Sequence, residues 1–224
     1  MRRIVLWDID HTLIDTRGVG RELSAAAFER VTGRRMERQA KIDGITEPVI
    51  FRETAGLHGI DSSRSDFERF AEALAEAHVQ RAAELRERGH ALPGAAAALS
   101  ALAAVDGIVQ TVVSGNVRAV AEIKLAVFGL DRHIRWELGA YGEDADERPD
   151  LVRIALERAG LEAEQAVLFD DTPAGVEAGV ASGVRVIAVA TGRSSEGELR
   201  AAGAGAALPD LTNTRRLVEL VAGV

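Results

Sequence analysis

The sequence predicts an α/β protein with a doubly wound parallel sheet as its core and a helical cap inserted into that core. Three observations predict it. Short, nearly continuous apolar runs end in polar residues or glycine, helical patterns separate most of these runs, and a long segment with little strand character follows the first run. Apolar runs of this kind are typical of parallel strands covered on both faces. Their alternation with helices favours a doubly wound sheet.

The expected elements follow one another in the order that such a sheet requires. The four expected strands span residues 3–9, 107–113, 166–169 and 184–190. The expected core helices span residues 95–104, 117–128 and 149–159. The last of these begins with Pro149 and ends at Gly160, which are favoured residues at the first position of a helix and just after its end. A further helix is expected to begin at Pro173.

The long segment between the first two strands divides the chain into two domains. Residues 1–15 and 91–224 are expected to form the α/β core, and residues 16–90 the cap, with helices at 21–32 and 66–88. Residues 16–90 contain 13 basic and 13 acidic residues, whereas the whole chain has a net charge of −8. Pro93-Gly94 marks the return to the core. A neutral helical insertion in an acidic core is therefore expected.

Composition excludes several classes of protein. The chain has 224 residues, 47% of them apolar, which is enough to form a buried core. It has no cysteine, and hence neither disulfides nor a thiolate zinc site. No apolar run approaches the length of a membrane span, and no secretory signal is evident. We therefore expect a cytoplasmic protein that does not bind membranes. Because its net charge is negative, we also expect it not to bind nucleic acid. Composition leaves monomer and homodimer equally open.

Polar residues at the end of the first strand form the first candidate site. Asp8 and Asp10 are two residues apart and begin on the same side of the strand, and Thr12 follows them. Ligands of open α/β sheets bind at the carboxyl ends of the strands. Two adjacent carboxylates repel each other unless a cation lies between them. The alternative is that one acid only caps the next helix, which does not explain the pair.

A second acidic pair and a polar turn follow later strands. Asp170 and Asp171 come directly after an apolar run; a helix cap explains one of these acids but not both. Together with the first pair they provide the all-oxygen ligands that suit a hard cation such as Mg²⁺. Ser114, Gly115 and Asn116 end another strand, and their hydroxyl and amide groups could bind a phosphate oxygen or form an ordinary loop.

These motifs, in this order, resemble those of the haloacid dehalogenase-like (HAD) superfamily, which has a Rossmann-like core. The segment 16–90 resembles its helical C1-type cap, and the stretch after residue 168 is similar to the phosphoglycolate phosphatase and β-phosphoglucomutase branch. The resemblance implies that Asp8 is a nucleophile that forms an aspartyl-phosphate, and that Asp10 is the general acid and base. It further implies that Mg²⁺ is held by Asp8, the Asp10 carbonyl and Asp171, with Asp170 close by. Thr12 would support the first motif, and Ser114 with Asn116 would bind the phosphoryl oxygens.

The third motif departs from the family pattern. The superfamily usually has a lysine there, often followed by proline, whereas this chain has Arg148-Pro149. Arginine binds phosphate in a bidentate manner but does not replace lysine without consequence. Only two of the 27 basic residues are lysines, and one of them, Lys124, follows Ser114 on the expected helix. Arg148 and Lys124 therefore remain alternative candidates for the third-motif cation.

In the cap, the segment that begins at Gly44 resembles the substrate-specificity segment of similar caps. On this resemblance we expect Thr46 and Arg52 to face the active site; an ordinary turn followed by a surface arginine is the alternative. The remaining histidines, apart from His11, occur singly and lack the spacing of metal ligands, so no role is assigned to them. They are His58, His78, His90 and His133.

The resemblance implies an Mg²⁺-dependent phosphatase that acts on a small phosphorylated metabolite. Asp10 favours phosphate-ester chemistry, because superfamily members such as dehalogenases lack the second acid. A phosphomutase of the β-phosphoglucomutase type would use the same residues and stays an alternative. A weakly active binding or regulatory protein with this fold is another, since Arg148 replaces the usual lysine. In each case the acidic site is expected to need a divalent cation before it accepts a phosphate.

Overall fold

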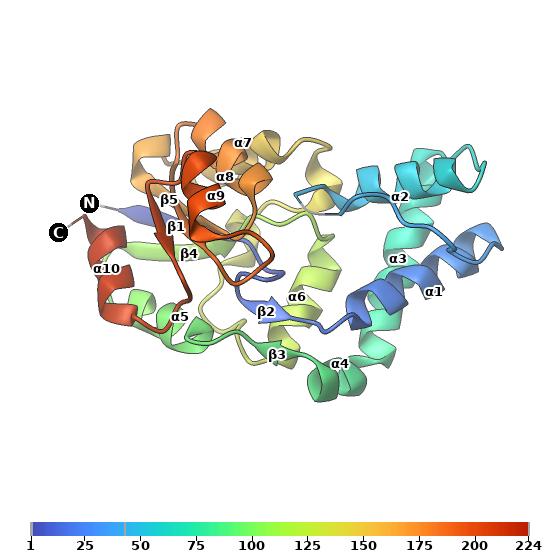
Figure 1. The fold of residues 1–224 in the computed structure, drawn as a ribbon, viewed down its shortest axis with the longest axis horizontal. Helices are drawn as coiled ribbons and strands as arrows, with labels where there is room; N and C mark the ends of the chain where they lie inside the picture. Colours follow the sequence, from blue (N-terminus) through green and yellow to red (C-terminus); the bar gives the residue numbers. More distant parts are fainter. Residues whose placement is uncertain (1, 43, 224) are drawn as a thin grey trace.

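The computed structural model describes residues 2–42 and 44–223, and it has a five-stranded parallel sheet at its centre. The strand order is β4–β1–β5–β6–β7, so β1 lies between β4 and β5 (Figure 1). This confirms the predicted doubly wound α/β class. The strands are β1 (Arg3–Trp7), β4 (Ile108–Val112), β5 (Ala166–Asp170), β6 (Arg185–Val189) and β7 (Ala206–Leu208).

Helices cover both faces of the sheet, because alternate side chains of its strands point to opposite sides. On one face Val5 and Trp7 pack among apolar residues of α5 (Ala95–Ala103), α6 (Arg118–Val127) and α10 (Thr214–Ala222). On the other face Ile4 and Leu6 pack with α7 (Arg148–Ala159), α8 (Pro173–Ala181) and α9 (Glu196–Ala201). Short 3₁₀ helices connect some of these elements: η1 (Trp136–Leu138), η2 (Gly142–Asp144) and η3 (Ala163–Gln165).

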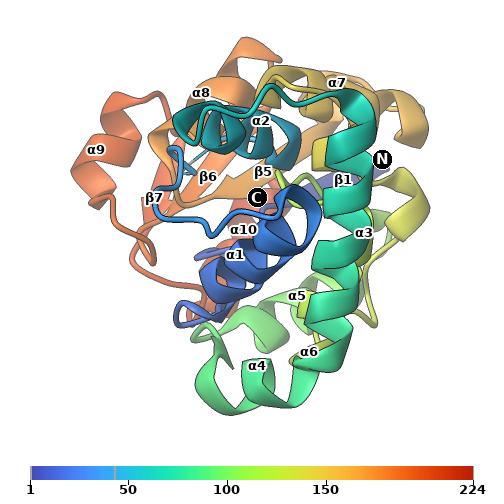
Figure 2. The ribbon, with the colours of Figure 1, turned by 90° about the vertical axis from the view of Figure 1, so that its right-hand side faces the viewer.

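The segment between β2 (Ile14–Asp15) and β3 (His90–Ala91) forms a helical layer, the cap, beside the carboxyl end of the sheet (Figures 1 and 2). Its helices are α1 (Val19–Thr32), α2 (Glu47–Leu57), α3 (Arg64–Gln80) and α4 (Ala82–Arg88). Four phenylalanines from three of these helices, Phe28, Phe51, Phe67 and Phe70, lie in its buried core, where the rings of Phe51 and Phe70 stack with centroids 4.7 Å apart. The core of this layer also includes side chains of α6, such as Val120, so the cap packs directly on the α/β core.

A short antiparallel pair joins the cap to the core. β2 (Ile14–Asp15) pairs with β3 (His90–Ala91), and these are the two places where the chain leaves and re-enters the core. His11 precedes this pair with a φ of 63°, in the left-handed region that favours glycine. Its carbonyl accepts a hydrogen bond from the Thr191 hydroxyl, at 2.5 Å, which ties this turn to the loop after β6.

Two details of the secondary structure differ from the sequence-based expectation. The helical stretch expected at 66–88 is broken at Arg81, where α3 ends, and α4 then directs the buried Leu85 into the core of the cap. The strand β7 and the helices α9 and α10 were not expected. β7 and α9 are only three and six residues long, too short for periodicity to reveal them.

Across the described residues, no helix is both long enough and apolar enough to span a membrane.

Candidate active site

A pocket of about 430 Å³ lies between the carboxyl end of the sheet and the cap. Core residues that line it come from the ends of β1, β4 and β5 and from α6 and α7. The predicted residues among them are Asp8, Asp10, Ser114, Gly115, Asn116, Lys124, Arg148, Asp170 and Asp171. The sequence-based candidates thus come together because parallel strands end at one edge of the sheet. The cap closes the other side with residues of α2 and α3.

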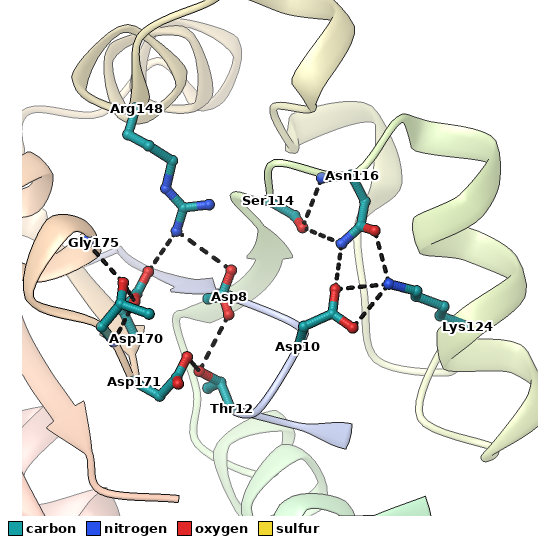
Figure 3. Close-up of polar contacts among 11 residues, drawn as sticks. Asp8, Asp10, Thr12, Ser114, Asn116, Lys124, Arg148, Asp170, Asp171 and Gly175 are labelled. Atoms are coloured by element: carbon teal, nitrogen blue, oxygen red, sulfur yellow. Dashed lines mark hydrogen bonds and ion pairs between the residues drawn. The ribbon is translucent and has the colours of Figure 1, made fainter. Parts of the chain in front are cut away.

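Asp8, Asp170 and Asp171 form a cluster of buried carboxylates (Figure 3). One oxygen from each lies within 4.8 Å of the others, a spacing that suits a shared metal ion. The cluster forms because β1 and β5 are hydrogen-bonded neighbours: the Asp8 amide donates to the carbonyl of Phe169, the residue just before Asp170, at 2.9 Å. Thr12 supports the cluster, since its hydroxyl lies 3.3 Å from Asp8 Oδ2.

Arg148 contacts this cluster. Its Nη2 donates to Asp170 Oδ2 at 2.5 Å and to Asp8 Oδ1 at 3.3 Å, from the first turn of α7. Lys124 does not contact Asp8, so Arg148 has the position expected of the third-motif cation. Asp170 is also held by the backbone amide and hydroxyl of Thr172, at 2.9 and 2.7 Å. Gly175 allows this close packing, because a Cβ there would lie 2.0 Å from Asp170 Oδ2.

Asp10 belongs to a second network, separate from the carboxylate cluster (Figure 3). Lys124 Nζ donates to both Asp10 oxygens, at 2.8 and 2.7 Å, and to Asn116 Oδ1 at 2.8 Å. Asn116 Nδ2 donates to Asp10 Oδ2 at 2.7 Å and to Ser114 Oγ at 2.9 Å. The prediction that Asp10 takes part in metal binding concerned its backbone carbonyl; its carboxylate is engaged by Lys124 and Asn116 instead.

The two networks shift the pKa values of the neighbouring aspartates Asp8 and Asp10 in opposite directions. Burial, and then the negative charge of Asp170, raises the pKa of Asp8 well above the usual value of a carboxyl group. Burial also raises the pKa of Asp171, and the charges of Asp8 and Asp170 add to that effect. Burial would raise the pKa of Asp10 too, but the charge of Lys124 and the hydrogen bond from Asn116 outweigh it and hold the pKa below its usual value.

Thr46 and Arg52 do not face the pocket as expected. Thr46 is fully buried and its hydroxyl donates to the Asp146 carbonyl at 2.9 Å, while Arg52 Nη1 donates to Asp146 Oδ2 at 3.0 Å. Both side chains therefore attach the beginning of α2 to the loop before α7. Their neighbours Ile45 and Glu47 line the pocket instead. Glu47 is held there because its amide donates to the Gly115 carbonyl at 2.9 Å.

Several polar residues that line the pocket were not among the candidates for the site, and two of them, Glu47 and His78, come from the cap helices α2 and α3. Glu47 lies next to the predicted Thr46, so only its orientation was missed. His78 is buried in α3 and lines the pocket together with Leu74, one helical turn earlier. Its place four residues after Leu74 fits one helix face, but a single histidine in a helix more often belongs to a core, so the sequence offered no sufficient signal.

Comparison with known proteins agrees with this arrangement. A family model described as haloacid dehalogenase-like hydrolase matches residues 5–189. Hexitol phosphatase A of Escherichia coli (strain K12) is 29% identical over 194 residues, which cover 82% of this chain and 81% of that protein.

Solved structures show the same fold over almost the whole chain. A hydrolase from Pseudomonas syringae has a TM-score of 0.70 at 18% identity and covers 98% of this chain and 99% of its own. A candidate β-phosphoglucomutase from Bacteroides vulgatus has a TM-score of 0.66 at 21% identity, covering 99% and 89%. The family match runs from β1 to the end of β6 and so includes every strand that contributes to the pocket. The chain belongs to the haloacid dehalogenase-like hydrolase family.

Proposed function

We propose that this protein is an Mg²⁺-dependent phosphatase that hydrolyses a small organic phosphate monoester through an aspartyl-phosphate on Asp8. The observation that carries this proposal is the different surroundings of two carboxylates at one strand end. Asp8 lies in the cluster with Asp170 and Asp171, while Asp10 points to Lys124 and Asn116. One carboxylate is thus placed to attack a phosphorus atom, and the other is placed to exchange a proton with the leaving oxygen.

The carboxylate cluster has the chemistry of a site for a hard divalent cation. Asp8, Asp170 and Asp171 supply only oxygen ligands and three negative charges, and Arg148 offsets a single one of them. With the backbone carbonyl of Asp10, these three would hold Mg²⁺. Bound Mg²⁺ would supply the positive charge that lets a carboxylate approach a phosphate.

The residues of the pocket divide the reaction between them. Asp8 attacks the phosphorus atom and the bond from phosphorus to the ester oxygen breaks. Asp10, which must be protonated in the substrate complex although Lys124 and Asn116 hold its pKa low in the free protein, donates its proton to the leaving alkoxide. A water molecule then attacks the phosphorus atom of the aspartyl-phosphate while Asp10 takes its proton. The bond from phosphorus to Asp8 breaks, which releases phosphate and restores Asp8. Arg148 binds Asp8 and Asp170 and adds fixed positive charge beside the transferring group. Ser114 accepts hydrogen bonds from Asn116 and keeps its own proton for a phosphoryl oxygen.

The comparisons support a small phosphorylated metabolite as the substrate. The relative from Escherichia coli is named a hexitol phosphatase, and this chain is similar to it over most of both lengths. The pocket of about 430 Å³ is large enough for a small organic phosphate.

The test is a screen of purified protein against phosphate monoesters, with Mg²⁺ and with EDTA. We expect phosphate release that requires Mg²⁺ and is lost in Asp8→Asn, while Asp106→Asn keeps full activity. Asp106 is an exposed acid in the turn before β4, at the opposite end of the sheet from the pocket, and it serves as the matched control. If Asp8→Asn retains Mg²⁺-dependent activity, the nucleophile assignment is wrong.

Two other outcomes would point to the alternatives. Isomerisation of a sugar phosphate without net release of phosphate would identify a phosphomutase that uses the same residues. Absence of turnover across the panel, with retained binding of a phosphate ester, would identify a binding or regulatory protein.

A further inference from the structure

His78 lines the cap side of the pocket, and one of its ring nitrogens is a buried hydrogen-bond acceptor without a partner among the described residues. The residue is 1% exposed and lies on α3, and its Nδ1 lies 2.9 Å from the Leu74 carbonyl. A carbonyl oxygen can only accept, so Nδ1 carries the ring proton and Nε2 has a lone pair. Nε2 is buried and has no hydrogen-bond partner among the described residues.

A second histidine of the cap shows what a purely structural role looks like here. His58 Nδ1 lies 2.8 Å from the Thr54 carbonyl, and its Nε2 accepts from the Glu37 amide at 3.0 Å. Both ring nitrogens of His58 are therefore satisfied by the protein itself. In His78, only Nδ1 has a hydrogen-bond partner within the described residues. Since a buried polar atom without a partner costs free energy, the second nitrogen needs a donor from outside the chain.

The charges around His78 restrict what that donor can be. Burial, and then the positive charge of Lys124, lowers the pKa of His78 to about 4, with Asp10 opposing the effect. The imidazole is thus neutral and acts as an acceptor at neutral pH. The same positive charge of Lys124 disfavours a cationic donor such as an ammonium group. A neutral hydroxyl group fits the acceptor best.

Glu47 adds a second polar group on the same side of the pocket. Its carboxyl group makes no hydrogen bond or ion pair with any described residue, and it too is influenced by the charges of Lys124 and Asp10. Burial raises the pKa of Glu47 to about 7, although the residue as a whole is half-buried. His78 and Glu47 are therefore polar groups of the cap on the Lys124 side of the pocket, apart from the carboxylate cluster that would receive the phosphate.

We propose that His78 Nε2 accepts a hydrogen bond from a hydroxyl group of the substrate, with Glu47 as a second contact, so that the site selects phosphate esters of polyols or sugars over alkyl phosphates. This inference rests on the proposed function, because it assigns the substrate class of that same pocket. A site built to bind a hydroxyl rejects the analogue that lacks it, because its buried polar groups are then left unpaired.

The test compares matched pairs of esters that differ only in their hydroxyl groups. The pairs are glycerol 3-phosphate with propyl phosphate, and sorbitol 6-phosphate with hexyl phosphate. The two chain lengths are used because they extend to different distances from the phosphate toward α3. In the wild type, kcat/KM should favour a polyol ester over its alkyl partner. His78→Leu should lower kcat/KM for that polyol ester about tenfold, the loss of one hydrogen bond, and change the alkyl ester less than twofold. His78→Gln, which keeps an acceptor oxygen, should recover most of the preference.

Controls separate recognition from a structural role. His58→Leu removes a histidine with two satisfied nitrogens from the same cap, and it should leave the polyol preference intact even if it lowers the melting temperature. If His78→Leu does not fold, His78→Phe replaces it in the comparison with His78→Gln. The proposal is overturned if the variant without an acceptor keeps the wild-type preference, or if both esters of a pair lose the same factor.

A binding measurement tests the inference apart from catalysis. In the Asp8→Asn background, calorimetry should show that sorbitol 6-phosphate binds about tenfold more weakly when His78 is also replaced by leucine. Binding of hexyl phosphate should not change. If the wild-type protein hydrolyses no ester but this difference is found, the proposed function fails and the substrate class stands. If hydrolysis is found without the difference, the reverse holds.

Discussion

Removal of one charge from the carboxylate cluster should stabilise the metal-free protein. Asp171 is buried beside Asp8 and Asp170, with Arg148 as the one basic residue in contact with the cluster among the residues described. Asp171→Asn keeps the shape of the side chain and removes its charge. We therefore expect the metal-free variant to melt at a higher temperature than the wild type at pH 8, although the substitution affects a residue of the proposed metal site.

The magnitude follows from the proton affinity of the cluster. Burial and the neighbouring acids keep the pKa of Asp171 far above that of an aspartate in the unfolded chain, which ionises near pH 4. At pH 7, which gives a lower bound for the assay at pH 8, folding therefore opposes ionisation over about three pH units, at about 1.4 kcal/mol each, or about 4 kcal/mol in all. Because the carboxyl groups of Asp8 and Asp171 both have a raised pKa and share this cost, we assign about half of it, or about 2 kcal/mol, to one of them. For a chain of this size that corresponds to about 4–8 °C in melting temperature.

The pH dependence has a definite sign. A carboxyl group whose pKa is raised by folding favours the folded state below the unfolded pKa, and that stability is lost as the pH rises toward the folded value. The melting temperature of metal-free wild type should therefore fall between pH 5 and pH 8, and that of Asp171→Asn should fall less. Added Mg²⁺ should raise the melting temperature of the wild type more than that of the variant, because a ligand stabilises the state that binds it.

The assay is thermal unfolding in EDTA and in Mg²⁺ at pH 5 and pH 8, with Asp106→Asn as the control for the loss of one negative charge. The reasoning is refuted if metal-free Asp171→Asn melts below the wild type at pH 8. It is equally refuted if Mg²⁺ raises the melting temperatures of both proteins by the same amount.

Three further substitutions test the other parts of the site. Arg148→Met should destabilise the metal-free protein by about 3–5 kcal/mol in a denaturant titration, since it leaves buried carboxylates without their cation. Arg148→Lys should recover part of this loss. Equal stability of the two variants would contradict the argument. Lys124→Met should raise the pKa of Asp10, and the part of the pH profile of kcat/KM that reports Asp10 should move to higher pH. If that part of the profile does not move, Asp10 is not the group that it reports. Gly175→Ala should reduce Mg²⁺-dependent activity at least tenfold, because the added Cβ would displace the Asp170 carboxylate. Activity near that of the wild type would show that α8 moves aside without consequence.

The polar residues at the strand ends could be predicted because each strand carries its own signal. Asp8, Ser114 and Asp170 each follow an apolar run, and parallel strands bring their carboxyl ends to one edge. The order of the motifs then identified the family, which the match over residues 5–189 confirms. Two of the elements that were missed, β7 and α9, are too short for periodicity to show, and their position depends on packing against β6.

The orientation of side chains had to come from the tertiary structure. The sequence by itself determined that this protein has an α/β core, an inserted helical layer and a set of acids at one sheet edge. It could not decide between Arg148 and Lys124, because both lie on helices that reach the pocket and only their packing directs one to Asp8 and the other to Asp10. For the same reason it expected Thr46 at the pocket, where the structure places Glu47 and His78. Local patterns fix which residues occur at a strand end, whereas contacts between cap and core, formed by segments far apart in the chain, decide which side chains meet.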